Sequence, residues 1–157
     1  GTLFSDESVV IRPEVAGRIT EIRFNEGERV RKGTVLLKLD DAIARATVDQ
    51  ALASLNLSRT EADRADELYR QGSGSARARD QARAKLLADE ASVTLARAQL
   101  AKLELTAPFD GVLGLRRVSV GDVLESAREQ QGLKTLDDID AAVLEVSGGI
   151  SIIPKQR

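Results

Sequence analysis

Two long stretches of the chain repeat small and apolar residues at alternating steps of four and three. In the first stretch, residues 43–69, no glycine or proline interrupts the pattern, which is carried by Ala44, Val48, Ala51, Leu55, Ser58, Ala62, Ala65 and Tyr69. In the second stretch, residues 76–103, the pattern is carried by Ala82, Leu86, Asp89, Val93, Ala96, Leu100 and Leu103. This spacing places side chains along one seam of an α-helix, so each stretch predicts a coiled-coil helix of about four heptads.

A short loop, QGSGS at residues 71–75, joins the two predicted helices. Because so short a loop turns the chain straight back, we expect an antiparallel hairpin roughly 40 Å long at 1.5 Å per residue. Alanines along the seam would let the helices approach closely. Ser58 and Asp89 would weaken the seam, which suits a hairpin surface that is also used by neighbours.

Strand-like sequence lies on both sides of the hairpin. Residues 9–41 and 105–125 are rich in β-branched residues between turn-forming glycines, which predicts several short strands. An offset of 94 residues superposes the two segments and aligns Gly17 with Gly111, Ile19 with Leu113, Phe24 with Val118, Gly27 with Gly121, Glu28 with Asp122 and Val30 with Leu124. Because each segment has too few strands to bury an apolar face alone, we expect both to form one small β-sandwich.

The composition argues against an enzyme. Cysteine and histidine are absent, which excludes the usual zinc sites, thiol nucleophiles and histidine-based triads. Aromatic residues make up only 3% of the chain, so few large side chains are present to line a deep pocket. The charges of the 23 basic and 25 acidic residues nearly cancel, so no strong overall field would attract nucleic acid or an anionic membrane. We therefore expect no catalytic residues, no metal and no cofactor. Because the chain starts with Gly1 rather than Met, we expect a trimmed piece of a longer protein.

The residues that carry the strands and the hairpin resemble those of periplasmic adaptor proteins, also called membrane fusion proteins, of the HlyD and RND-efflux type. The phrases VAGRITEIRFNEGERVRKGTVLLKLDD and LTAPFDGVLGLRRVSVGDVLES resemble the two halves of that family's lipoyl domain. The resemblance implies an α+β protein with a split lipoyl-like β domain at 1–42 and 104–125 and an inserted coiled-coil α-hairpin at 43–103.

The resemblance also implies a function. Such adaptors form a ring, commonly a hexamer, in the periplasm and bridge an inner-membrane RND-type pump and a TolC-like outer-membrane channel in a tripartite efflux system. The full-length proteins are anchored to the inner membrane. They are not enzymes, and they do not bind nucleic acid.

The adaptor pattern places three channel-binding residues at the hairpin tip, and the matching positions here are Arg64, Leu68 and Ser75. Arg64 and Leu68 stand one helical turn apart on one face, and Ser75 opens the second helix, where its hydroxyl can cap free N–H groups. The chain departs from the pattern at Gly74 and Ala78, where adaptors usually have an apolar and an acidic residue. That departure removes a hydrophobic staple and the carboxylate of a capping box.

The last part of the chain departs further. Residues 126–157 resemble the C-terminal piece of YetF-like membrane proteins and predict a small α/β tail, with a helix near Leu136 to Val143 and a hairpin around SGG. A chimera, an engineered sequence and a frameshifted end are all compatible with this tail. An acidic run there is expected to start the helix rather than to bind calcium, and it comprises Asp137, Asp138 and Asp140.

Two other functions stay open on the sequence alone. Lipoyl and biotinyl carrier domains of acyl-transfer enzymes modify a lysine in the turn between their halves, but helices replace that turn here, so we expect Lys38 to face solvent from a strand. An adaptor of a type I secretion or ATP-driven exporter system usually has a longer hairpin. A basic cluster lacks interleaved aromatic residues and predicts a solvated helix face; it comprises Arg77, Arg79, Arg83 and Lys85.

Overall fold

The computed structural model describes residues 9–114, 118–126 and 150–154. The described residues form two compact units. One unit is the helical segment Asp41–Ala101, and the other is a β unit built from the described residues before and after it. The α+β class predicted from the sequence is confirmed.

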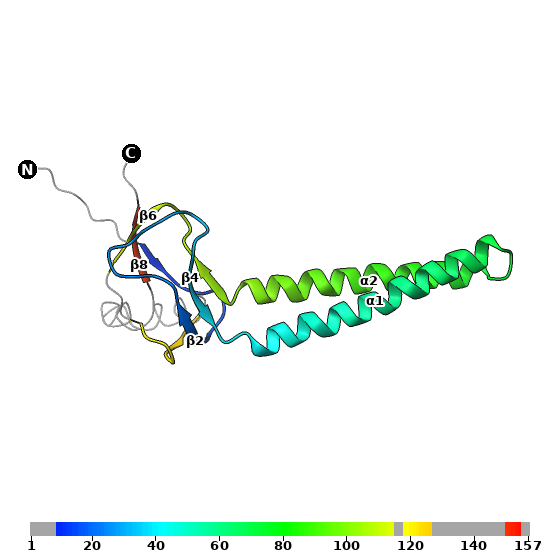
Figure 1. Ribbon diagram of the computed structural model, residues 1–157, viewed down its shortest axis with the longest axis horizontal. Coiled ribbons are helices and arrows are strands. Elements are labelled where there is room, and N and C mark those ends of the chain that lie inside the picture. The colour runs from blue at the N-terminus through cyan, green and yellow to red at the C-terminus, as the bar shows by residue number, and fades with distance from the viewer. Residues whose placement is uncertain (1–8, 115–117, 127–149, 155–157) are drawn as a thin grey trace, which may run out of the picture. The chain divides into compact units, whose positions relative to one another are not determined.

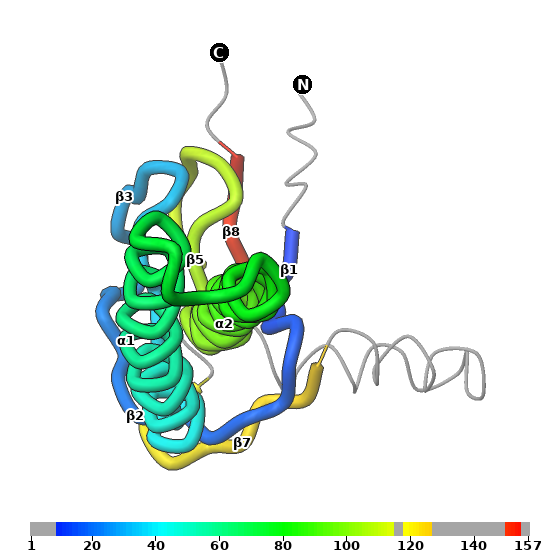
Figure 2. Tube along the Cα trace, turned by 90° about the vertical axis from the view of Figure 1, so that its right-hand side faces the viewer, coloured from blue at the N-terminus to red at the C-terminus, as the bar shows by residue number. Residues whose placement is uncertain are grey.

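The helical unit is a two-helix antiparallel hairpin. Helix α1 spans Ala42–Arg70 and helix α2 spans Ala76–Ala101, and Figures 1 and 2 show them side by side. The side chains buried between them are those of Val48, Leu55, Ser58, Ala62, Asp89, Val93 and Ala96. All seven belong to the predicted heptad pattern, so the seam is confirmed.

Two residues of the pattern do not lie in the seam. Leu103 was predicted to end the second helix, but α2 ends at Ala101 and Leu103 packs against the core of the β unit. Its carbonyl oxygen accepts a hydrogen bond from the amide of Leu39 at 2.8 Å, so the backbone is already part of a strand ladder there. Tyr69 is 41% exposed, because the helices end just beyond it and leave the ring uncovered on one side.

The two polar positions of the seam are satisfied locally. Lys85 lies one turn before Asp89 on α2, and its Nζ atom is 2.7 Å and 2.9 Å from the two carboxylate oxygens. This hydrogen bond, helped by the hydroxyl of Ser58, holds the pKa of Asp89 below its ordinary value. Asp89 is only 7% exposed and Ser58 only 3%, so the seam carries a buried polar contact between its apolar layers.

The β unit consists of two four-stranded antiparallel sheets. The first has the order β1 (Val9–Ile11), β8 (Ile150–Pro154), β6 (Gly111–Leu113) and β3 (Arg29–Val30). The second has the order β5 (Glu104–Thr106), β4 (Val35–Leu39), β2 (Gly17–Ile22) and β7 (Val123–Leu124). Each sheet combines strands from both sides of the hairpin, so the two predicted halves do build one β structure.

Strands of one repeat half pair with strands of the other half at equivalent positions. Strand β2 of the first half pairs with β7 of the second, and β6 of the second half pairs with β3 of the first. Gly27 donates its N–H to the carbonyl oxygen of Leu113 at 2.9 Å, and its repeat partner Gly121 donates to that of Ile19, also at 2.9 Å. Both glycines have positive φ, which other residues rarely adopt. The two halves therefore pair with each other through equivalent strands and equivalent hydrogen bonds at the turns.

The core of the β unit is made of aliphatic residues from both halves. Repeat partners occupy equivalent buried places: Ile19 and Leu113 are each 1% exposed, and Phe24 and Val118 are each 4% exposed. The remaining buried members are Ile11, Val30, Leu36, Leu37, Leu39, Leu105, Ala107, Leu124, Ile150 and Ile152. Neither half could bury these side chains without the other.

The end of the predicted tail takes part in this core. Strand β8 lies between β1 and β6, and its Ile150 and Ile152 are 1% and 0% exposed. Residues 150–154 therefore belong to the β unit. The helix predicted near residues 136–143 and the hairpin predicted around SGG lie outside the described residues.

Replacing Gly111 by alanine should test the place of β8. A Cβ atom at Gly111 would overlap the carbonyl oxygen of Ile153 and lie 2.9 Å from Cγ1 of Ile152, so we expect a loss of about 2 to 3 kcal/mol in the free energy of unfolding. The repeat supplies a matched control, because a Cβ at Gly17 would meet only the Leu39 side chain, at 3.1 Å, and should change stability by less than about 1 kcal/mol. Chemical denaturation measures both, and equal effects would contradict the placement of β8 against β6.

Candidate functional site

The hairpin tip begins where α1 ends, at the green loop of Figure 1. Gly72 has a φ of +77°, and its N–H donates to the carbonyl oxygen of Tyr69 at 3.1 Å. The next amide, that of Ser73, donates to the carbonyl oxygen of Leu68 at 2.9 Å. Together these bonds form a Schellman motif, which satisfies the last carbonyl groups of a helix and turns the chain back.

Gly74 and Ser75 complete the turn. The N–H of Gly74 also donates to the carbonyl oxygen of Leu68, at 3.0 Å, and a Cβ at position 74 would lie 3.0 Å from the Cβ of Leu68. The glycine therefore lets the loop close tightly on Leu68, and the larger apolar residue of the adaptor pattern would need the loop to shift. Ser75 caps α2, since its hydroxyl oxygen accepts the N–H of Ala78 at 3.0 Å.

The three residues that the sequence singled out are all exposed at this tip. Leu68 is 41% exposed, although its carbonyl oxygen accepts hydrogen bonds from the loop. Ser75 is exposed directly after Gly74, the glycine that closes on Leu68. Arg64 is exposed one turn below Leu68 on α1, and among the described residues it makes no ion pair. The structure thus joins Leu68 to the loop that ends in Ser75 and leaves the guanidinium of Arg64 available for another molecule.

Sequence reasoning missed one contact of the tip. The guanidinium carbon of Arg79 lies 4.1 Å from the centroid of the Tyr69 ring, which joins the last turn of α1 to the first turn of α2. Arg79 was predicted to lie on a solvated basic face, but its side chain is only 23% exposed because it covers the ring. The signal was available: in an antiparallel hairpin, residues about equally far from the loop face each other, as Asp66 and Arg83 also do at 2.8 Å.

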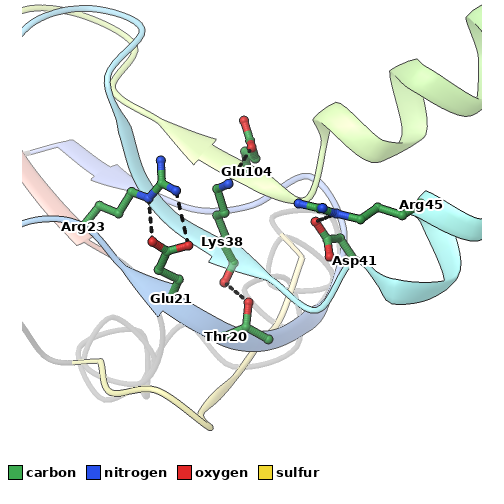
Figure 3. Close-up of polar contacts among 7 residues, drawn as sticks. All are labelled: Thr20, Glu21, Arg23, Lys38, Asp41, Arg45 and Glu104. Atoms are coloured by element: carbon green, nitrogen blue, oxygen red, sulfur yellow. Dashed lines mark hydrogen bonds and ion pairs between the residues drawn. The ribbon is translucent and has the colours of Figure 1, made fainter. Parts of the chain in front are cut away.

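The β unit carries a row of charges across three strands (Figure 3). Lys38 on β4 lies opposite Glu21 on β2 and Glu104 on β5, and its Nζ is 3.4 Å from a carboxylate oxygen of Glu104. We expected Lys38 to face solvent, but its side chain is only 19% exposed, because β4 is a central strand of its sheet and the charged neighbours cover the side chain. A lysine paired in mid-strand differs from the free lysine in a turn that carrier domains modify, so this geometry does not favour a carrier.

Two further pairs in Figure 3 lie on the surface. Arg23 donates from Nε to Glu21 at 2.7 Å, and this hydrogen bond is the main reason why the pKa of Glu21 is lowered from its ordinary value. Asp41, just before α1, accepts a hydrogen bond from Arg45 at 2.8 Å. Pairs as exposed as these contribute little to stability, and they offer no reactive group.

No arrangement in the described ranges suggests catalysis or metal binding. Within residues 9–114, 118–126 and 150–154, no three acidic side chains lie close enough to hold a metal ion. A groove of about 570 Å³ beside β3 and β6 is lined by Arg29, Arg31 and Asp110 among others, and its described lining contains no serine, threonine or lysine. The same ranges contain no helix with the length and hydropathy that a membrane crossing needs.

Comparison with known proteins gives a family. The sequence model described as RND MFP, barrel-sandwich hybrid domain, matches residues 7–146, which includes most of the segment that resembled YetF-like proteins. The antibiotic efflux pump periplasmic linker protein ArpA of Pseudomonas putida is 31% identical over 94% of this chain and 39% of its own length. The multidrug resistance protein MdtA of Escherichia coli is 31% identical over 80% of this chain and 34% of its own length. The chain thus spans less than half the length of these relatives.

Solved structures share the fold of this chain. A MacA–MexA chimeric protein that contains the Pseudomonas aeruginosa MexA α-hairpin domain has a TM-score of 0.76 and 25% identity, with 94% of this chain and 48% of that one covered. A putative efflux transporter from Bacteroides eggerthii shares the fold, with a TM-score of 0.71 at 19% identity over 96% of this chain and 40% of that one. Strands from before and after the helical hairpin in the sequence build the β unit, and the family model matches most of the chain. The chain therefore belongs to the RND membrane fusion proteins and contains their barrel-sandwich hybrid domain.

Proposed function

We propose that this chain is the central part of a periplasmic adaptor in a tripartite efflux system. The observation that carries the proposal is the family match over residues 7–146, because the chain has both the β domain and the hairpin of that family. ArpA is named a periplasmic linker of an antibiotic efflux pump, and MdtA a multidrug resistance protein. On this proposal the chain works in the periplasm as a structural link and catalyses no reaction.

The partners follow from that role. The full-length adaptor would be anchored to the inner membrane, contact an RND-type pump there, and reach a TolC-like channel of the outer membrane with its hairpin tip. Subunits would associate side by side in a ring, for which a hexamer is our expectation. The match to an RND adaptor domain favours this pump class over a type I secretion or ATP-driven exporter.

Docking through Arg64, Leu68 and Ser75 is part of the proposal. Leu68 offers apolar surface in the middle of a polar tip, since it is 41% exposed while its backbone is fixed by two hydrogen bonds from the loop. Arg64 offers a planar group with several donors, which suits acidic side chains or helix C-terminal carbonyls of a partner. Ser75 already accepts the Ala78 N–H, so its hydroxyl hydrogen remains to donate to the channel.

Site-specific crosslinking tests this function. A photoreactive residue at Ser73, in the exposed loop, should capture an outer-membrane channel protein when the full-length adaptor is produced in its own cells, and mass spectrometry would identify it. The same residue at Leu57, which is 61% exposed in the middle of α1, should not capture the channel. Capture of no outer-membrane protein from Ser73, at normal adaptor abundance, would contradict the proposal.

A further inference from the structure

The tip of this hairpin lacks the two side-chain devices that the adaptor pattern provides. Gly74 offers no apolar staple, and Ala78 offers no carboxylate for a capping box. Backbone hydrogen bonds hold the loop to α1, through Leu68 and Tyr69. Such bonds in an exposed loop open easily unless a side-chain contact fixes the backbone that accepts them.

The contact between Tyr69 and Arg79 is placed to fix that backbone. Arg79 lies 4.1 Å from the ring centroid, and its Nε and Nη2 atoms are each 3.3 Å from Oδ1 of Asp80, which orients the guanidinium. The carbonyl oxygen of Tyr69 accepts the N–H of Gly72. The amide nitrogen of Tyr69 would lie 3.2 Å from a Cβ atom added at Gly74, so the loop also runs close to this part of the backbone. A movement of Tyr69 would therefore move the turn.

We propose that Tyr69 and Arg79 form a positioning pair that clamps the two helix ends together, keeps the loop closed and so presents Leu68 and Ser75 to the channel. The inference rests on the docking function proposed above. A tip that is already ordered loses less conformational entropy on binding, so the pair would strengthen docking without touching the partner. It would replace the staple and the capping box by one contact between the helices.

Amide hydrogen exchange on this chain tests the clamp without a partner. Tyr69→Leu and Arg79→Gln should each speed exchange of the Ser73 and Gly74 amides by about 2- to 5-fold, the factor that corresponds to an exposed cation–π contact. The double variant should exchange no faster than either single variant, because both remove the same contact. Tyr69→Phe keeps the ring face and should match the wild type.

Arg77→Gln is the matched control for loss of charge, since Arg77 is exposed in the same turn of α2. Circular dichroism should show the same helix content in every variant, which keeps a loss of folding apart from a loosened loop. Unchanged exchange in Tyr69→Leu and Arg79→Gln would overturn the clamp, and so would equal acceleration by Arg77→Gln.

Crosslinking from Ser73 in the full-length adaptor separates the clamp from the docking function. If the clamp presents the tip, Tyr69→Leu and Arg79→Gln should lower channel capture by similar factors, and Tyr69→Phe should not. A loss with Tyr69→Leu alone would show that the ring contacts the channel directly, and would overturn the positioning role. If the wild-type tip captures no channel while the exchange results hold, the docking function fails and the clamp survives only as a property of the hairpin.

Discussion

Efflux should collapse when Leu68 of the full-length adaptor is replaced by serine, although the protein remains at normal abundance. Leu68 is 41% exposed at the tip, so the change removes apolar contact surface and creates no cavity in the seam. Loss of one such anchor commonly costs about 1 to 2 kcal/mol at an interface. In the proposed ring, repetition would multiply the loss, because each subunit would contribute to avidity. Drug susceptibility, adaptor abundance and channel crosslinking measure the outcome.

Leu68→Met is the matched control for this prediction. Methionine keeps an apolar side chain of similar volume, so resistance and crosslinking should stay close to the wild type. Wild-type resistance with Leu68→Ser would refute docking through this residue. Loss of resistance together with loss of protein would mean that Leu68 supports folding instead.

The hairpin of the Leu55→Asp variant should unfold at a lower temperature than the wild-type hairpin. Leu55 is 8% exposed in the seam, so the substitution buries a charge against apolar neighbours and should cost about 3 to 4 kcal/mol. Leu100→Asp should cost less, because Leu100 is only partly buried. Thermal melting followed by far-UV circular dichroism measures both.

Leu57 gives the control for the same substitution on the same helix. It is 61% exposed two residues beyond Leu55, so Leu57→Asp should change stability by less than about 0.5 kcal/mol. A similar loss at Leu55 and Leu57 would show that the seam does not run where the structure places it.

The hairpin could be predicted because its determinants are local. The steps of four and three that include Val48, Leu55 and Val93 define a helical face, and a glycine-containing loop between two such faces permits little except an antiparallel return. The heptad spacing did not locate the end of the second helix, because an apolar residue can continue the spacing even where it packs against another part of the chain. Leu103 fits the heptad spacing, yet it packs against the β core, and its carbonyl oxygen already accepts a hydrogen bond from Leu39 of β4.

The repeat predicted that the two halves share a core, but not how. Alignment of Gly27 with Gly121 identifies equivalent turns within each half. Only the folded chain shows that β2 of the first half pairs with β7 of the second, that β3 pairs with β6, and that residues 150–154 lie between β1 and β6. Pairing between distant segments depends on the total burial of both sheets, which no local pattern records.

At the tip, the local sequence accounts for the chemistry of the turn. Gly72 tolerates the positive φ that ends α1, and Ser75 supplies the oxygen that caps α2. Which side chains meet across the turn depends on the tertiary structure, since the stacking of Arg79 on Tyr69 joins residues of two helices. Backbone preferences act within a few residues of the chain, whereas contacts between helices depend on how the whole seam aligns them.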